Sequence, residues 1–290
     1  MWGAFPLYFA LLDAVSPVEV VAHRVVWSLV FLIIVITIAR TWRTIIGVLT
    51  WRRVGVLALA AAFLAVNWGV YVYAVASDQV IQASLGYFIN PLGSVGLGVI
   101  FLRERLVRGQ WIGVGIALLA VLVLTASYGQ LPWISLTLAF SFGLYGLIKK
   151  FVGIGAVASL TIETAALAPF AIALLFAWEM NGTAAFVLDG TTITILLILL
   201  GPVTALPLLA FGASANRIPL ATVGILQYLT PILQFLLGLL VFNEQMTASR
   251  WIGFVLVWIA LVVFTASALH QQRKGRASRD LTELEVSEPS

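Results

Sequence analysis

Three ionisable side chains stand together near the start of one apolar run. Glu19 and His23 are spaced i, i+4 and therefore share one face of a helix, and Arg24 follows directly. An ionisable group inside a transmembrane span costs about 2.5–3.5 kcal/mol on insertion scales, so it usually serves a pathway or a partner. Because His titrates near physiological pH, this set could form a proton-sensitive gate. The alternative is an ion-paired cluster near the outer interface that anchors the helix and lets Arg24 snorkel.

A fourth ionisable residue, Glu163, lies in a later apolar run, near its expected cytoplasmic end. A shift of 140 residues, the period of a repeat described below, pairs Glu163 with His23. A carboxylate and an imidazole at mirrored positions would suit proton coupling, with protonation favouring one access state. A structural ion pair with Lys149 or Lys150 is an equally good explanation.

Amides, phenols and an indole interrupt several other apolar runs. If these groups faced lipid they would lack hydrogen-bond partners, so we expect them to face the protein interior. Together they could line a cavity that mixes aromatic surface with a few polar groups, as small-molecule sites usually do. The alternative is interhelical hydrogen bonding, worth roughly 0.6 kcal/mol per bond. The candidate solute-binding residues are Asn67, Trp68, Tyr71, Gln82, Tyr87, Asn90, Tyr145, Gln227, Tyr228 and Gln234.

Two prolines, Pro91 and Pro231, fall inside expected helices at matched positions. Each removes a backbone donor and clashes with the preceding turn, which bends or interrupts a helix. A matched pair of kinks suits a hinge in each half of the protein. A static kink that aids packing is the alternative.

The elements that carry these residues are transmembrane helices. The chain of 290 residues is 62% hydrophobic and 10% charged, with mean hydropathy +1.08. Most of its apolar runs are long enough to cross a hydrocarbon core of roughly 30 Å. We predict an all-α polytopic membrane protein with ten helices. The predicted spans are 1–12, 18–39, 54–76, 80–101, 109–126, 131–149, 158–178, 191–212, 220–242 and 250–269.

The first predicted helix is short. Twelve residues rise only about 18 Å, so this segment is either a half-helix or the end of a helix whose true start lies upstream, and we favour the upstream start.

The distribution of basic residues predicts the orientation. Of 16 Lys and Arg, Arg24 lies in a helix and Arg250 in an outer connection, and the other 14 face the cytoplasm if the C-terminus is cytoplasmic. Basic residues placed between apolar runs indicate membrane topology and not nucleic-acid binding.

Motifs for enzyme chemistry and for cofactors are missing from the sequence. The chain has no cysteine and two distant histidines, His23 and His270, so we expect no metal site and no disulfide. It also lacks a phosphate-binding GxxxxGK[ST] loop, an HExxH helix and a GxSxG elbow. We therefore expect neither an enzyme nor a cofactor.

Residues 91–127 recur as residues 231–267 at a constant offset of 140. Pro91, Glu104 and Gly113 match Pro231, Glu244 and Gly253, and the triplet 125–127 is identical to 265–267. The offset divides the chain into repeats 1–127 and 128–269, followed by residues 270–290 as a disordered cytoplasmic tail. Each repeat holds five helices, an odd number, so the two repeats must cross the membrane in opposite senses. Inverted repeats are typical of secondary transporters with a site near the midplane; a repeat kept only for packing is the alternative.

Several segments resemble the EamA-type branch of the drug/metabolite transporter superfamily, and within it the RarD subfamily. The most specific is the run from Gln82 to Leu92 (QASLGYFINPL), and Trp2-Gly3, His23-Arg24 and Asn67-Trp68 add to it. The resemblance implies a ten-helix carrier in the bacterial inner membrane, with both termini cytoplasmic and with export as the favoured direction.

We therefore predict a secondary transporter of a small organic solute or drug that works by alternating access. Its expected partners are the solute, the lipid bilayer and protons as a coupling ion; no nucleic acid and no oligomer are indicated. The alternative is a membrane receptor or scaffold that keeps the fold without transport. An intramembrane enzyme is disfavoured because no nucleophile–base pair is apparent.

Overall fold

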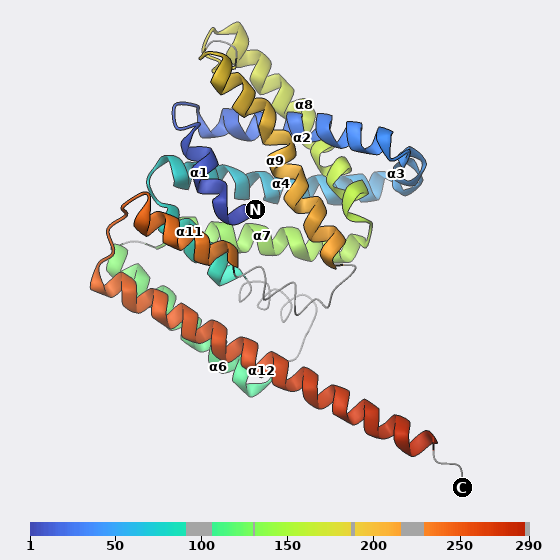
Figure 1. Ribbon diagram of the computed structural model, residues 1–290, viewed down its shortest axis with the longest axis vertical. Coiled ribbons are helices and arrows are strands. Elements are labelled where there is room, and N and C mark those ends of the chain that lie inside the picture. The colour runs from blue at the N-terminus through green and yellow to red at the C-terminus, as the bar shows by residue number, and fades with distance from the viewer. Residues whose placement is uncertain (91–105, 130, 187–188, 216–228, 288–290) are drawn as a thin grey trace. The chain divides into compact units, whose positions relative to one another are not determined.

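The structure is a computed structural model that describes residues 1–90, 106–129, 131–186, 189–215 and 229–287. Every regular element in these ranges is helical (Figure 1). Six of the described helices are long and apolar enough to cross a membrane, and two shorter apolar helices accompany them. The chain is thus a multi-pass membrane protein, whereas the count of ten helices stays a prediction because parts of the expected spans 80–101 and 220–242 lie outside the described residues.

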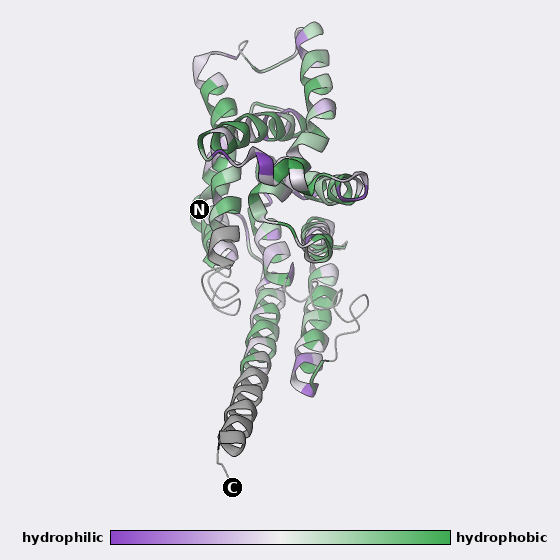
Figure 2. Ribbon diagram, turned by 90° about the vertical axis from the view of Figure 1, so that its right-hand side faces the viewer, coloured by the Kyte–Doolittle hydropathy of each residue, from purple (hydrophilic) through white to green (hydrophobic). Residues whose placement is uncertain are grey.

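The chain forms two compact units, and the first comprises residues 1–94 and 133–245. Four of the six long apolar helices lie in it: α2 (Pro17–Ile38), α4 (Trp51–Ala76), α8 (Ala156–Met180) and α9 (Thr191–Ala215). Helix α7 (Trp133–Val152), which contains one of the two shorter apolar segments, accompanies them. Shorter elements are η1 (Trp2–Ala4), α1 (Phe5–Ala10), α3 (Trp42–Val48), α11 (Leu229–Leu240) and the helical residues 80–90. Helix α2 packs against α4, α8 and α9, α4 also packs against α7 and α8, and η1 and α1 contact α11. Figure 2 shows that these helices are apolar along most of their length.

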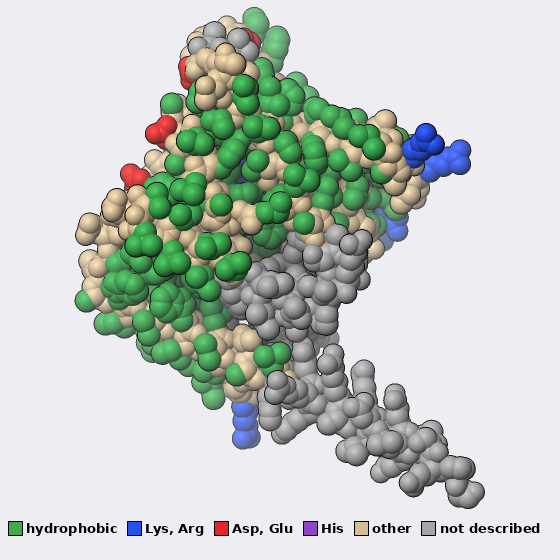
Figure 3. Space-filling model, in the orientation of Figure 1, with side chains coloured by type: hydrophobic (Ala, Val, Ile, Leu, Met, Phe, Trp, Pro, Cys, Tyr) green, Lys and Arg blue, Asp and Glu red, His purple; other side chains and the backbone are tan. Residues whose placement is uncertain are grey.

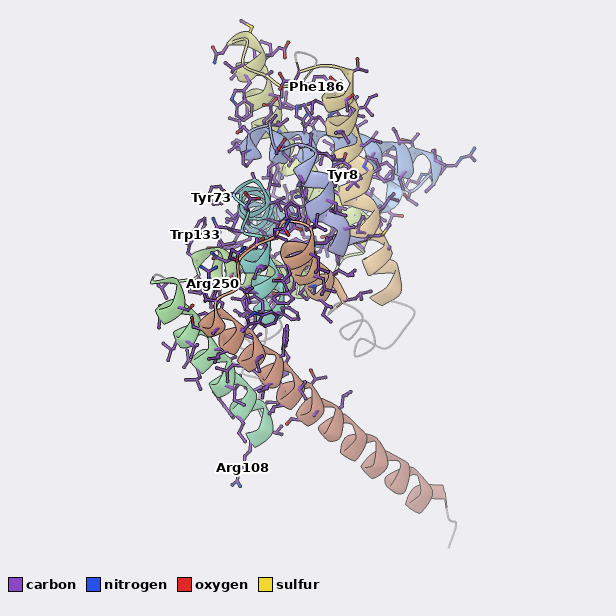
Figure 4. The ribbon with its side chains drawn as sticks, turned by 60° about the vertical axis from the view of Figure 1, so that its left-hand side comes forward. Tyr8, Tyr73, Arg108, Trp133, Phe186 and Arg250 are labelled. Carbon is purple, nitrogen blue, oxygen red and sulfur yellow. The ribbon has the colours of Figure 1, made fainter. Side chains whose placement is uncertain are left out.

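Close backbone approaches fix how these helices cross. A side chain at Gly201 of α9 would overlap the carbonyl group of Trp27 in α2, and Ser28 Oγ donates to Gly201 O at 3.4 Å. An added Cβ at Gly86 would lie 2.8 Å from the carbonyl oxygen of Ser135 in α7. At another contact, the ring centroids of Tyr73 (α4) and Trp133 (α7), which are both labelled in Figure 4, lie 5.7 Å apart. Small residues thus allow the tight helix packing that membrane helices require.

The second unit comprises residues 95–132 and 246–290, and it contains α6 (Arg108–Tyr128) and α12 (Ala248–Ser287). Helix α6 packs along its length against the first half of α12, and the two helices run antiparallel. The start of α6 meets the middle of α12, where Gly113 contacts Phe264. The end of α6 meets the start of α12, where Ser127 Oγ and Ser249 Oγ lie 2.8 Å apart.

Two elements differ from the sequence expectation. Helix α3 is not among the predicted spans, because it has only seven residues. It begins with exposed Trp42 and Arg43, and exposed Trp51 follows at the start of α4; these residue types favour a membrane interface. Figure 3 shows basic side chains gathered where α3 lies. Helix α12 continues to Ser287, across the region 270–290 for which polar composition predicts disorder. Most residues of that region are good helix formers, so a helix can continue there without burial.

Candidate functional site

Arg24 lies deep inside the first unit, about 10 Å along α2 from Pro17 at 1.5 Å per residue. The side chain is 3% exposed. Its Nε donates to Thr204 Oγ1 of α9 at 3.1 Å, and its Cζ lies 4.3 Å from the centroid of the Trp68 ring. A buried guanidinium that is held by two other helices does not snorkel to an interface, so that alternative for Arg24 is wrong.

Aromatic rings from three helical segments surround this guanidinium. Phe9 of α1 lies 5.2 Å from Arg24 Cζ, and its ring meets Tyr71 of α4 edge to face at 5.8 Å. Tyr71 in turn meets Tyr87 of the helical segment 80–90 at 5.7 Å. A cation over an aromatic face gains about 2 kcal/mol when both are desolvated, so these rings partly replace the hydration that Arg24 has lost.

Gln234 of α11 completes this cluster. Its Nε2 donates to Tyr71 Oη at 3.0 Å and to the Trp2 carbonyl at 3.2 Å, and its side chain is 1% exposed. We call Phe9, Arg24, Trp68, Tyr71, Tyr87 and Gln234 the Arg24 cage. The cage draws on α1, α2, α4, α11 and the segment 80–90, which lie far apart in the sequence.

Two buried polar atoms of the Arg24 cage have no hydrogen-bond partner among the described residues. They are a donor, Arg24 Nη1, and an acceptor, Gln234 Oε1. A nearby sequence candidate, Asn90, has an unpartnered buried oxygen of the same kind, Oδ1. Leaving such a group unpaired costs about 1–3 kcal/mol, and more when it is charged. The arrangement therefore has free capacity to bind both an acceptor and a donor.

No carboxylate forms an ion pair with Arg24 within the described part of the chain. The buried carboxylates have other partners: Glu19 accepts from Ala185 N at 2.8 Å, and Glu163 lies 3.0 Å from Lys149 Nζ. The partly buried Glu244 accepts from Ile81 N at 3.1 Å. A buried charge without a partner costs several kcal/mol even after relaxation.

Glu19 and His23 come together as their spacing predicts. Glu19 Oε1 lies 3.9 Å from His23 Nε2, and both side chains are buried. His23 Nδ1 accepts a hydrogen bond from Trp27 Nε1 at 3.2 Å, so a neutral His23 carries its proton on Nε2, toward Glu19. The imidazole also stacks against Phe186 at 5.0 Å, before the start of α9 (Figure 4). At this distance the two groups are not hydrogen-bonded, and His23 Nε2 has no hydrogen-bond partner among the described residues, so the role of the pair as a gate stays a prediction.

Glu163 has the local partner Lys149 and two further donors. Tyr145 Oη donates to Glu163 Oε2 at 3.1 Å, and Ser159 Oγ donates to Oε1 at 2.5 Å. Lys149 Nζ also donates to Tyr145 Oη at 3.0 Å. Tyr145 therefore belongs to a polar cluster between α7 and α8, while His23 has separate partners. No group of three or more His, Asp or Glu that could hold a metal occurs in the ranges described.

Other candidates hold helices together. Asn67 Nδ2 donates to the Leu138 carbonyl at 2.9 Å and to Ser141 Oγ at 3.1 Å, which ties α4 to α7. Gln82 bonds locally to Gln79 at 2.7 Å. Asn67 thus makes the interhelical hydrogen bonds of the alternative explanation, whereas the Gln82 side chain bonds within its own helical segment. Pro231 is buried near the described start of α11, whereas Pro91, Gln227 and Tyr228 lie outside the described residues.

Sequence reasoning missed Phe9, Thr204 and Gly201. Phe9 stands in an apolar run where one more Phe carries no signal, and Thr204 resembles any hydroxyl residue of a membrane helix. Gly201 lies just before Pro202, and Pro207 follows a few residues later; this irregular run was the only available hint that α9 contributes to a site. Tyr8, beside Phe9, ties α1 to α9 through a bond from its Oη to the Leu196 carbonyl at 2.5 Å (Figure 4).

Residues 1–126 match the EamA-like transporter family. "Protein RarD" of Streptomyces exfoliatus is 48% identical over 96% of this chain and 88% of its own length. "Uncharacterized transporter YojE" of Bacillus subtilis is 42% identical over 96% and 94% of the two chains, and "Protein RarD" of Escherichia coli is 40% identical over 94% and 93%. A solved crystal structure is similar with a TM-score of 0.59 at 19% identity, over 93% of this chain and 94% of that chain, which shows a shared fold.

Proposed function

This chain belongs to the EamA-like transporter family, with RarD proteins among its relatives, and on that premise we propose that it is a secondary transporter of a small organic solute. The solute site is the Arg24 cage. Transport follows alternating access in the bacterial inner membrane, with the C-terminus in the cytoplasm and export as the favoured direction.

The observation that carries this proposal is the unused binding capacity of the Arg24 cage. A receptor or scaffold of the same fold needs a satisfied interior, because buried polar groups without partners only lower its stability. Here a charged donor, Arg24 Nη1, and an amide acceptor, Gln234 Oε1, have no partner among the described residues, and Arg24 lies over the Trp68 ring. Small-molecule sites combine apolar walls with a few such polar groups.

The packing of α6 against α12 supports the inverted arrangement of repeats 1–127 and 128–269. The contact Gly113–Phe264 becomes Gly253–Leu124 when each residue is shifted by 140 into the other helix, and both contacts occur. Gly109–Ser267 likewise becomes Ser249–Ser127, and both occur. Each contact therefore occurs twice, once with the α6 and α12 residues in each role. A pseudo-two-fold axis in the membrane plane relates antiparallel helices in this way.

Within this proposal, rocking of one repeat against the other opens the site to alternate sides. Pro91 and Pro231 are the hinges, and protons are the coupling ion. Two buried clusters are available to carry the proton, one around Glu19 and His23 and one around Glu163. Replacing the responsible residue, by His23→Asn or Glu163→Gln, abolishes the dependence of flux on a pH gradient, and an unchanged dependence rejects that residue.

Reconstitution tests transport directly. The purified chain is placed in liposomes, and flux is measured for a panel of organic anions, amino acids, nucleosides and drugs against empty liposomes. We expect flux of at least one class, and we expect Arg24→Gln to lower it by roughly tenfold or more, as the loss of a charged hydrogen bond does. Arg43→Gln, at an exposed position outside the cage, serves as the matched control. Flux equal to that of empty liposomes for the whole panel would favour the receptor or scaffold.

A further inference from the structure

We propose that the solute is an organic anion whose carboxylate pairs with the Nη edge of Arg24. This inference rests on the proposed function, since it names the chemical class of the solute that the Arg24 cage binds. The described residues supply three observations for it: a buried cation with no counter-ion among them, a guanidinium whose Nη1 has no hydrogen-bond partner there, and an acceptor in the same cage that is likewise unpaired.

The first observation is the missing counter-charge. Arg24 is buried in a membrane-spanning helix, and within the described ranges it contacts a hydroxyl and aromatic rings but no carboxylate. Rings and a hydroxyl lower the energy of a buried cation without neutralising it. A bound anion supplies the missing charge, and the solute is the species that must enter this site in every transport cycle.

The second observation is which part of the Arg24 guanidinium is still available to an anion. Trp68 and Phe9 approach the guanidinium carbon, and Thr204 takes the Nε–H, so these neighbours leave Nη1 without a partner. A guanidinium presents its donors in a planar fork that matches the two oxygens of a carboxylate. The remaining donor capacity of Arg24 therefore suits a carboxylate better than a neutral carbonyl.

The third observation concerns the rest of the solute. Trp68, Tyr71 and Tyr87 offer ring surface next to the charge, which favours a compact apolar or aromatic body. Gln234 Oε1 has no donor among the described residues, while Nε2 of the same amide donates to Tyr71 Oη and to the Trp2 carbonyl. A hydroxyl or ammonium group on the solute would satisfy this oxygen, so a carboxylate that carries such a donor should bind more tightly than a plain carboxylate.

Three solutes of similar size separate these contributions. Phenylacetate has the carboxylate alone, phenylalanine adds an ammonium group, and phenylacetamide replaces the carboxylate by a neutral amide. Binding to the detergent-solubilised full chain is measured by thermal shift and by titration calorimetry, with chloride and inorganic phosphate as controls for binding of any anion. We expect phenylacetate and phenylalanine to bind and phenylacetamide to bind at least about tenfold more weakly.

Variants identify the residues responsible. Arg24→Gln should weaken phenylacetate binding by roughly 10- to 100-fold, while Arg24→Lys keeps the charge and retains part of the affinity. Gln234→Met should abolish any preference for phenylalanine over phenylacetate and leave phenylacetate binding within about threefold. Arg43→Gln should bind all three solutes as the unaltered chain does.

Equal binding of phenylacetamide and phenylacetate overturns the inference, and so does anion binding that survives in a folded Arg24→Gln variant. A response to chloride or phosphate as strong as that to phenylacetate also overturns it, because the site would then hold an inorganic counter-ion. These outcomes are separable from failure of the proposed function. If the chain transports only neutral solutes, it is a transporter and the anion inference alone is wrong. If it binds the anion but produces no flux into liposomes, the anion site stands and the proposed transport function is wrong.

Discussion

At the scale of single residues, Arg24 should lower the stability of the empty protein. Its uncompensated charge costs several kcal/mol, whereas its contacts with Trp68 and Phe9 return about 2 kcal/mol. Arg24→Met keeps much of the side-chain volume and removes the charge. We therefore expect this variant to unfold at a higher temperature, by about 1–2 kcal/mol of stability, while it loses its response to phenylacetate. Thermal unfolding without solute measures the change, with Arg43→Met as the control. A clearly lower unfolding temperature would mean that the Arg24 charge is already compensated.

For the ion pair of Lys149 with the buried Glu163, removing the cation should lower the stability, in contrast to the gain expected at Arg24. Lys149→Met leaves the Glu163 carboxylate with only the two hydroxyl donors of Tyr145 and Ser159. Breaking a fully buried ion pair costs 3–5 kcal/mol, and since Lys149 is partly exposed we expect about 2 kcal/mol. Adding Glu163→Gln to Lys149→Met should recover most of the loss, because the lone buried charge is then gone. Denaturant titration in mixed micelles measures both variants. Equal stability of the single and double variants would show that this pair contributes little.

The sequence predicted pairs within one helix better than groups from several helices. The i, i+4 spacing of Glu19 and His23 placed them together, and Lys149 was one of two partners expected for Glu163. The assembly of Arg24 with Trp68, Tyr71 and Gln234 depends on how three helices cross, which residue types alone do not encode. For the same reason Asn67 and Tyr145, which looked like solute ligands, have structural partners.

At the scale of elements, Gly201 controls how closely α9 approaches α2. A Cβ at this position would overlap the Trp27 carbonyl, a backbone atom that cannot turn aside. Gly201→Ala should therefore separate the helices, stretch the bond from Arg24 to Thr204, and cost about 1–3 kcal/mol of stability. Gly55→Ala in α4, where no atom lies within 4 Å of an added Cβ, is the matched control and should be neutral. Thermal unfolding and phenylacetate binding together measure the effect, and a Gly201→Ala variant that matches Gly55→Ala in both would contradict it.

Helix positions were predictable because length, apolar composition and flanking charges define them without any tertiary information. The expected spans 18–39, 158–178 and 191–212 agree with α2, α8 and α9 to within a few residues. Helix α3 escaped prediction since seven residues give too short a signal. The packing faces of the long helices could not be predicted, because helices that are apolar all round show no amphipathic stripe.

At the scale of the whole molecule, the proposed inversion of the two repeats is open to a test with introduced cysteines, since the chain has none. The pairs Ser127–Ser249 and Gly109–Ser267 lie at the two ends of α6, where it meets the start and the middle of α12. Ser127→Cys with Ser249→Cys, and Gly109→Cys with Ser267→Cys, should each cross-link within one chain under mild oxidation. Ser127→Cys with Ser267→Cys joins positions at opposite ends, and it should not cross-link.

Single cysteines then report which end faces which side of the membrane. The positive-inside pattern puts the Arg108 end of α6 in the cytoplasm and the Arg250 end of α12 outside. In intact cells, a membrane-impermeant maleimide should therefore label Ser249→Cys, whereas Gly109→Cys should react only after the membrane is permeabilised. Because α6 and α12 are antiparallel and occupy equivalent places in the two repeats, this result requires the repeats to cross the membrane in opposite senses. Labelling of both single variants from outside would place both ends of α6 on one side, and neither the ten-helix topology nor alternating access between inverted halves could then hold.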